Sequence, residues 1–411
     1  MTTTEHEDHT QGEAAEEGPG AAPPWPPRPG HRPPPGRRAN RRRSLMAVPR
    51  PGNPFDTWPI TARIARAAVQ HPQPMLRALG EREPRWADGR KLHPAMQLLA
   101  ALSARQEGPN PTFDPPAMRR DMRNLTKLGT PWRHTVHAHD RKVPGDGVEI
   151  PVRCYRPHGA PGQVPGIVYA HGGGFVVGDL DTHDATCRLL ADVAGCVVVA
   201  VDYRLAPEHP FPAALDDVVA AFRWVHHHAD ELGIDPAAIG VAGDSAGATI
   251  SAGVCHETRR LGLPTPTVQG LIYPLVDIRM RFDSYETFAE GFSLTRRTMD
   301  WFRDQYLPHL TDELLTDPRV SPLCGDLTGL PPAVIATAGF DPLRDDGRAY
   351  ADALREAGVD VTYRCYDDFL HGFYGMMVLP DAAAACVEID RALGRVLWEA
   401  HRAARDARDW H

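Results

Sequence analysis

The chain has 411 residues, a formal net charge of −8 and 42% hydrophobic residues. This length suffices for one large α/β domain with a smaller accessory layer, and the negative charge argues against nucleic acid as a partner. No apolar run reaches about 18 residues, so we expect no membrane span. The first residues lack the charged start and apolar stretch of a secretory signal, and the seven cysteines show no C-x-x-C spacing, which together favour free thiols in the cytoplasm.

The N-terminal part of the chain differs in composition from the rest. Residues 1–53 are acidic at first and then rich in proline and arginine, and they contain too few apolar side chains to offset the entropy cost of ordering. We therefore expect a disordered tail, although its arginines could contact an acidic surface and its prolines an aromatic groove. Residues 54–132 form a predicted helical region, with apolar residues at helical spacing. The helical patterns cover 61–69, 94–102 and 112–127.

From about residue 133 the hydrophobic period changes. Alternating residues at 135–139 and 148–155 predict two antiparallel strands joined by a turn at Gly145. Short apolar runs then alternate with helical patterns, which is typical of a mostly parallel sheet covered by helices on both faces. The predicted strands are 166–170, 196–202, 238–242, 269–273, 333–337 and 360–366. The predicted helices are 183–194, 213–231, 246–260, 345–357 and 381–403, with a further helical stretch at 292–302 inside an interruption at about 279–325.

The most informative motif is Gly-Asp-Ser-Ala-Gly at Gly243–Gly247. A strand-like run precedes it and a helix-like run follows, so its two glycines allow a tight turn that exposes Ser245 at a helix N-terminus. Such a motif arises by chance in about one in ten chains of this length, so its context matters. Upstream, a second predicted strand ends in His-Gly-Gly-Gly-Phe at His171–Phe175. Downstream, Asp341 and His371 follow the serine in the Ser-Asp-His order of an α/β-hydrolase.

These residue types suit nucleophilic catalysis. A neutral serine hydroxyl is a poor nucleophile, so Ser245 needs a base, and the ordinary pKa of histidine suits His371 to that role. A carboxylate would hold the imidazole in one tautomer. Asp341 is one candidate for this carboxylate, and Asp345 and Asp346 are two others.

Five motifs together resemble the hormone-sensitive-lipase group (bacterial family IV) of α/β-hydrolase fold serine esterases. They are His171–Phe175, Tyr203–Leu215, Gly243–Gly247, Asp341–Asp345 and His371–Phe373. The resemblance implies an α/β-hydrolase catalytic domain over residues 133–411. It also implies a helical cap built from an N-terminal segment within 54–132 and from the insertion at about 279–325.

The resemblance also implies roles for individual residues. The catalytic triad would be Ser245, Asp341 and His371. Backbone N–H groups would form the oxyanion hole, from Gly173, Gly174 and Ala246. Supporting roles around that hole would fall to His171, Gly172 and Asp244. Aromatic side chains would line the substrate pocket, and we expect Phe175, Phe292 and Trp301 there.

The activity implied by the resemblance is hydrolysis of short- to medium-chain acyl esters through an acyl-enzyme, without a cofactor and with a homodimer as a possible assembly. We expect no metal site, because successive residues such as His226–His228 point in different directions on a helix and no H-E-x-x-H motif accompanies them. Two alternatives remain open. One is a ligand-binding protein without catalytic activity on the same fold, which the presence of His371 disfavours. The other is an amidase or lactonase with the same triad.

Overall fold

The computed structural model of the chain describes residues 67–107, 113–126, 136–160 and 162–409. The predicted tail at 1–53 and most of the helix predicted at 61–69 lie outside the described residues.

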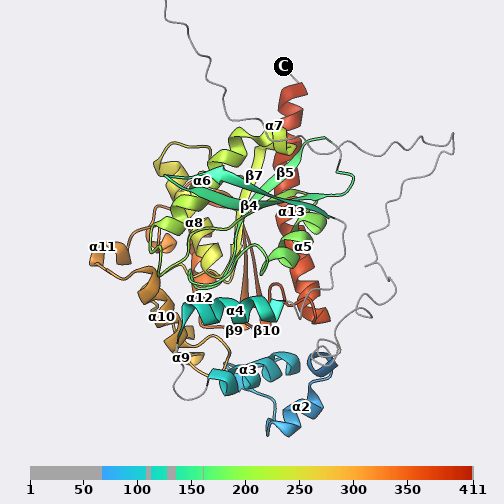
Figure 1. The fold of residues 1–411 in the computed structure, drawn as a ribbon, viewed down its shortest axis with the longest axis vertical. Helices are drawn as coiled ribbons and strands as arrows, with labels where there is room; N and C mark the ends of the chain where they lie inside the picture. Colours follow the sequence, from blue (N-terminus) through green and yellow to red (C-terminus); the bar gives the residue numbers. More distant parts are fainter. Residues whose placement is uncertain (1–66, 108–112, 127–135, 161, 410–411) are drawn as a thin grey trace, which may run out of the picture. The chain divides into compact units, whose positions relative to one another are not determined.

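A sheet forms the centre of the catalytic region (Figure 1). It has eight strands in the order β10-β9-β8-β7-β5-β6-β4-β3. Its strands are β3 (Val136–Pro144), β4 (Glu149–Pro157), β5 (Val164–Ala170), β6 (Val197–Val201), β7 (Ile234–Asp244), β8 (Gln269–Ile272), β9 (Ala333–Phe340) and β10 (Val361–Leu370). Strand β4 pairs antiparallel with β3 and β6, whereas all other neighbours in this sheet are parallel. The mostly parallel sheet predicted from the sequence is thus confirmed.

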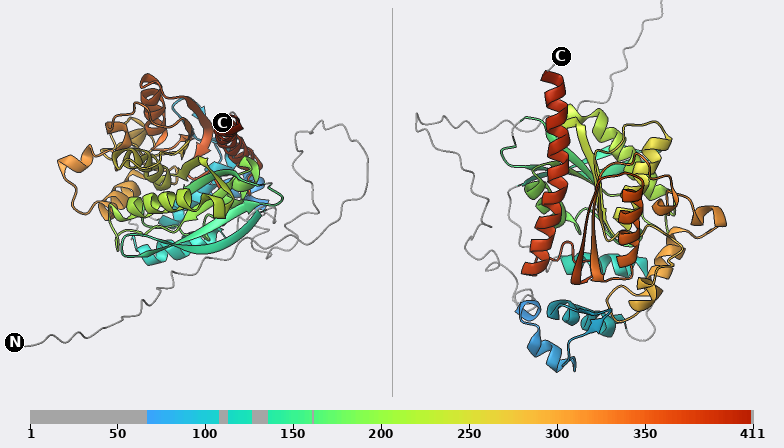
Figure 2. Two further views of the ribbon diagram at one scale, coloured as in Figure 1. Left: turned by 90° about the horizontal axis from the view of Figure 1, so that it is seen from above. Right: turned by 180° about the vertical axis from the view of Figure 1, so that it is seen from behind.

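Helices cover both faces of the sheet because its central strands are apolar on both sides. In β5, Val168 and Ala170 belong to one buried cluster, while Ile167 and Tyr169 belong to the other. The first face packs against α6 (Ala213–His227), α8 (Ala246–Arg260) and α12 (Arg344–Glu356). The second face packs against α5 (Asp184–Ala194) and the long helix α13 (Pro380–Asp409), which is red in Figure 2.

Several elements differ in length from their predictions. Strand β7 begins at Ile234 because this residue pairs with Val164 ahead of the predicted start. The helix predicted at 213–231 is broken at His228 into α6 and α7 (Ala229–Leu232). Helix α13 continues beyond its predicted end at residue 403, and its His401 Nδ1 lies 2.6 Å from a carboxylate oxygen of the buried Asp235.

Smaller elements lie outside the sheet and its covering helices. N-terminal to the sheet are α2 (Gln73–Ala78), a two-stranded hairpin of β1 (Trp86–Ala87) and β2 (Arg90–Lys91), α3 (Pro94–Glu107) and α4 (Pro115–Thr126). Between β8 and β9 the chain forms α9 (Ser284–Thr287), α10 (Arg296–Tyr306), α11 (Asp312–Leu315) and a 3-10 turn, η1 (Pro322–Cys324).

Helix α10 begins later than predicted. The Thr295 side chain accepts the N–H of Thr298 and caps the helix, so Phe292 lies ahead of it.

All seven cysteines are free thiols. Within the described ranges, no helix combines the length and apolar character needed to cross a lipid bilayer.

Candidate active site

Ser245 occupies the sharp turn between β7 and α8. Its φ of 53° lies in the left-handed region, which a non-glycine residue adopts only when its surroundings hold it there. The Ser245 N–H donates to the carbonyl of Ile272 on β8 at 2.8 Å. The neighbouring backbone leaves no room for a side chain at either motif glycine. A Cβ on Gly243 would lie 2.4 Å from the carbonyl carbon of Gly247. A Cβ on Gly247 would lie 2.0 Å from the carbonyl oxygen of Ala170.

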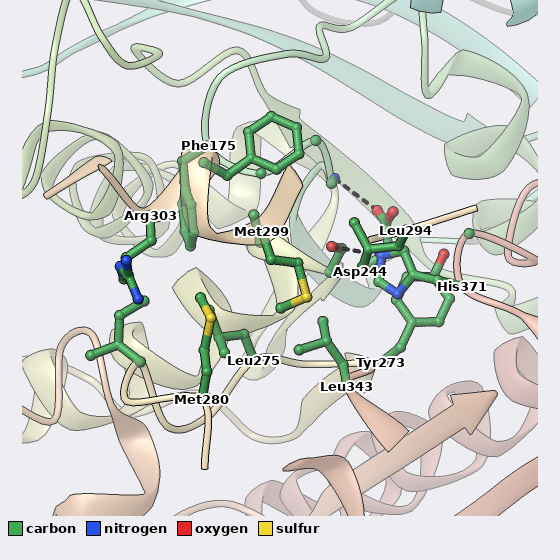
Figure 3. A pocket seen from close by; sticks show the side chains of 18 of the residues that line it. Phe175, Asp244, Tyr273, Leu275, Met280, Leu294, Met299, Arg303, Leu343 and His371 are labelled. Carbon is green, nitrogen blue, oxygen red and sulfur yellow. Dashed lines mark hydrogen bonds between the residues drawn. The ribbon is translucent and has the colours of Figure 1, made fainter. Parts of the chain in front are cut away.

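Two further predicted side chains meet at this turn. His371 follows β10, and its Nε2 lies 3.0 Å from Ser245 Oγ (Figure 3). Its Nδ1 lies 2.8 Å from Oδ2 of Asp341, which follows β9 and is fully buried. The other Asp341 oxygen accepts the N–H of Leu343 at 2.8 Å. Serine, imidazole and carboxylate therefore form one continuous chain of hydrogen bonds.

The two alternative aspartates point elsewhere. Asp345 accepts the N–H of Ser284 at 3.1 Å and pairs with Arg344 at 2.7 Å. Asp346 accepts the N–H of Val276 at 3.1 Å, and its complete burial raises its pKa well above the ordinary value for a carboxyl group. Neither contacts His371, so Asp341 is the aspartate in position to orient the imidazole.

Asp244 ties the serine turn to the glycine loop. Its buried Oδ1 accepts the N–H of Gly172 at 2.9 Å and the hydroxyl of Tyr169 at 2.6 Å. Burial alone would raise its pKa, but the adjacent His183 and the Tyr169 hydrogen bond outweigh this effect and lower the pKa. The ionised carboxylate thereby holds the start of the glycine loop beside the nucleophile (Figure 3).

His171 stabilises the same loop. It is 3% exposed, its Nδ1 lies 2.9 Å from the carbonyl of Gly172, and its ring stacks on Tyr203 with centroids 4.2 Å apart. Burial, together with the neighbouring His183, lowers its pKa to about 4, so the ring is neutral near pH 7. This geometry suits a supporting role.

The glycine loop turns back on itself beside Ser245. Gly173 and Gly174 have φ values of 128° and 59°, and the N–H of Val177 donates to the carbonyl of Gly173. No described residue accepts a hydrogen bond from the N–H of Gly173, Gly174 or Ala246, and all three residues line the cavity in front of Ser245. These N–H groups are thus available to a bound oxygen atom.

The cavity in front of Ser245 has a volume of about 230 Å³ and is largely apolar. Sequence reasoning did not find most of the side chains that line it. They are Met122, Tyr273, Leu275, Ile278, Met280, Leu294, Met299, Phe302, Arg303 and Leu343. A signal existed for three of them, because Met299, Phe302 and Arg303 have the i, i+3, i+4 spacing of one helix face.

Of the three predicted pocket aromatics, one lines this cavity and two do not. Phe175 lines it (Figure 3), and its ring stacks on that of Tyr306 with centroids 3.8 Å apart. Phe292 instead packs between Phe288 and Phe340, because it precedes α10. Trp301 stacks on Phe113 at 4.9 Å, because its neighbour on the helix, Phe302, takes the pocket-facing position.

Among the residues that the structure describes, no group of three or more His, Cys, Asp or Glu side chains is arranged so that it could hold a metal ion. In the His226–His228 run, two imidazoles bind backbone carbonyls separately. Nδ1 of His227 lies 2.7 Å from the carbonyl of Arg223, and Nδ1 of His228 lies 2.9 Å from that of Trp224.

Comparisons with known proteins agree with the fold and the motifs. A family model for the α/β-hydrolase fold matches residues 167–375. The chain is 45% identical over 322 residues to "Carboxylic ester hydrolase LipN" of Mycobacterium tuberculosis, covering 76% of this chain and 85% of that protein. It is 40% identical over 253 residues to "Ethyl acetate hydrolase" of Pseudomonas putida, covering 60% of this chain and 79% of that protein.

A solved ester hydrolase, EH1AB1 from the metagenome of Lake Arreo, superposes with a TM-score of 0.70 at 42% identity and covers 74% of this chain and 98% of its own. The chain belongs to the α/β-hydrolase fold family and, within it, to the hormone-sensitive-lipase group.

Proposed function

We infer that this protein is a serine carboxylester hydrolase that works through an acyl-enzyme on Ser245. The observation that carries this inference is the hydrogen-bonded chain from Ser245 Oγ through His371 to the buried Asp341. Relatives named as carboxylic ester hydrolase, carboxylesterase and ethyl acetate hydrolase support the ester as the bond that is cleaved.

In the proposed reaction, Ser245 Oγ attacks the ester carbonyl carbon while His371 Nε2 takes its proton. Asp341 stabilises the imidazolium that forms. The negative oxygen of the tetrahedral intermediate accepts hydrogen bonds from the N–H groups of the glycine loop and of Ala246 at the start of α8. The dipole of α8 also stabilises this negative charge. His371 then gives its proton to the leaving alcohol, and water hydrolyses the acyl-enzyme with the same base.

The size of the cavity supports small substrates. A largely apolar space of about 230 Å³ suits a short- to medium-chain acyl group better than a long one. We propose p-nitrophenyl butyrate as the test substrate, with Ser245→Ala expected to abolish its turnover. Ser251→Ala is the matched control, because this serine lies on the same helix and its buried hydroxyl donates to the backbone carbonyl of Gly247 at 2.8 Å.

Two outcomes would contradict this proposal. Turnover by the wild type no faster than in buffer would favour a ligand-binding protein, and full activity in Ser245→Ala would place the nucleophile elsewhere. A matched ester and anilide assayed side by side would separate an esterase from an amidase.

We also propose that α4 and α10 act as the two parts of a cap. Met122 on α4 and Met299 on α10 line the same cavity from segments far apart in the chain. Arg119 of α4 supports this, since it donates to the carbonyls of Val176 and Ala206 at 2.8 and 3.0 Å and pairs with Glu208 at 2.7 Å.

Two further expectations concern the whole protein. The free cysteines support a cytoplasmic location, which fractionation of cells would test. Light scattering of the purified protein would test whether it assembles as the homodimer that the resemblance allows.

A further inference from the structure

The chain turns sharply directly after His371, which follows the end of β10. Gly372 and Gly375 have φ values of 82° and 103°, both in the left-handed region. Glycine adopts such φ values without strain, so these two positions allow the chain to turn on either side of Phe373 and Tyr374. The His371 imidazole contacts Asp341 and the Tyr273 ring, and the backbone that follows it is fixed by what holds Phe373 and Tyr374.

The two intervening residues are held in different ways. Phe373 is fully buried among aromatic rings, including Tyr273 and Phe369 at 5.6 and 5.3 Å between centroids. Such packing favours certain ring orientations but fixes the position of a ring less tightly than a short hydrogen bond does. Tyr374 instead donates its hydroxyl to Oδ1 of Asp390 on α13 at 2.5 Å, and this bond has a defined direction and length.

Asp390 is an unusual residue for the interior of a helix–sheet interface. It is fully buried, and among the described residues its Oδ2 has no hydrogen-bond partner. Burying a carboxyl group is costly unless it is hydrogen-bonded, so an apolar residue would fill this position at lower cost. The hydrogen bond of Asp390 to the histidine-bearing segment is what this carboxyl group contributes there.

We propose that Asp390 is a positioning residue that holds His371 over Ser245 through the hydroxyl of Tyr374. The inference rests on the proposed ester hydrolysis and names a further residue on which that reaction depends. Asp390 touches neither the substrate nor the reacting atoms. Without it, the turn that begins at Gly372 would be held less firmly, and His371, which directly precedes that turn, would sample positions in which its Nε2 lies beyond hydrogen-bonding distance of Ser245 Oγ.

The test uses the full-length protein and steady-state kinetics with p-nitrophenyl butyrate. Tyr374→Phe removes the donor, and we expect kcat to fall about ten- to a hundredfold with KM changed less than twofold, since misplacement of a catalytic group affects the chemical step. Asp390→Asn keeps an oxygen acceptor and should retain kcat within about threefold. The control is Tyr350→Phe, because Tyr350 is also fully buried but its hydroxyl has no partner among the described residues.

A double variant separates positioning from stability. Tyr374→Phe combined with Asp390→Leu removes both partners of this hydrogen bond, so neither is left buried without the other and the melting temperature should be close to that of the wild type. We expect its kcat to remain as low as that of Tyr374→Phe alone. A double variant with wild-type kcat would overturn the proposal, as would an equal loss of kcat in Tyr350→Phe. Failure of ester hydrolysis itself would be visible in the wild type before any variant is compared.

Discussion

The ring of Phe302 on α10 covers Gly174 in the glycine loop so closely that a Cβ added to the glycine would lie 2.3 Å from the ring. Phe302 belongs to the insertion between β8 and β9, whereas Gly174 follows β5. The insertion therefore contacts the loop whose N–H groups are proposed to bind the oxyanion, and it leaves no room for a side chain there.

Gly174→Ala should lower kcat for p-nitrophenyl butyrate about a hundredfold. The new methyl group would push the loop away from Phe302, and alanine is strained at a φ of 59°. Gly329→Ala is the control, because Gly329 has a φ of 72° with no atom within 4 Å of an added Cβ. Adding Phe302→Ala to Gly174→Ala should restore part of the activity, and normal kcat in Gly174→Ala alone would contradict the role of the loop.

Asp341→Asn should reduce kcat by about three to four orders of magnitude, because the amide would favour the wrong tautomer of His371. Asp345→Asn should cost far less, since Asp345 contacts Ser284 and Arg344 and not the imidazole. Both variants are compared by kcat on the same ester. The reverse ranking would assign the orienting role to Asp345.

Met299→Ala should shift the acyl preference toward longer chains. Met299 is 5% exposed and its side chain points into the cavity in front of Ser245 (Figure 3), so its removal enlarges that cavity. The readout is the ratio of kcat/KM for p-nitrophenyl octanoate to that for the butyrate, which we expect to rise about tenfold, or about 1.4 kcal/mol in transition-state binding. Met96→Ala, a buried methionine of α3 that does not line the cavity, should leave the ratio unchanged.

Asp390 should make the protein less stable as the pH rises toward 8. Burial raises the pKa of Asp390 to about 8, so the folded state keeps a proton that the unfolded state has already released above pH 4. Stability is therefore fully present at low pH and falls by up to about 1.4 kcal/mol per pH unit between these two values. In thermal melts, the wild type should lose stability relative to Asp390→Asn between pH 5 and pH 8, and parallel curves would contradict this assignment.

The titratable groups that surround Asp390 do not change charge in the pH range in which the stability is expected to fall. They are Cys187 on α5, Cys196 before β6, Cys386 on α13 and Tyr374. Burial raises the pKa of each, that of Cys386 to about 12, so all four stay neutral over the range in which Asp390 titrates.

Sequence patterns predicted the sheet and helices well because the signals are local. An apolar run such as 166–170 and a helical pattern such as 246–260 report their own conformation, and the structure has β5 and α8 at those positions. The predicted ends of strands were less accurate where pairing with a residue far away in the sequence extends the strand. Ile234 joins β7 through Val164, and no residue near Ile234 signals this pairing.

The pocket was the least predictable part of the site. Phe292 and Trp301 were chosen as large aromatic residues in the insertion. However, α10 begins only after its N-cap residue Thr295, and the helix directs other side chains toward Ser245. A helix rotates its side chains by about 100° per residue, so one position separates Trp301, stacked on Phe113, from Phe302 in the cavity wall.

The sequence by itself determined the family, the tight turn at Ser245 and the chain order of the candidate acid and base, because each depends on neighbouring residues or on simple order. Residue chemistry alone left Asp341, Asp345 and Asp346 open as orienting acids, and the family resemblance implied Asp341. Nothing in the sequence indicated the contact between Tyr374 and Asp390. Only the tertiary structure decided that Asp341 lies beside His371 and that Tyr374 contacts Asp390, because a hydrogen bond requires two atoms within about 3 Å, and the packing of strands and helices sets that distance.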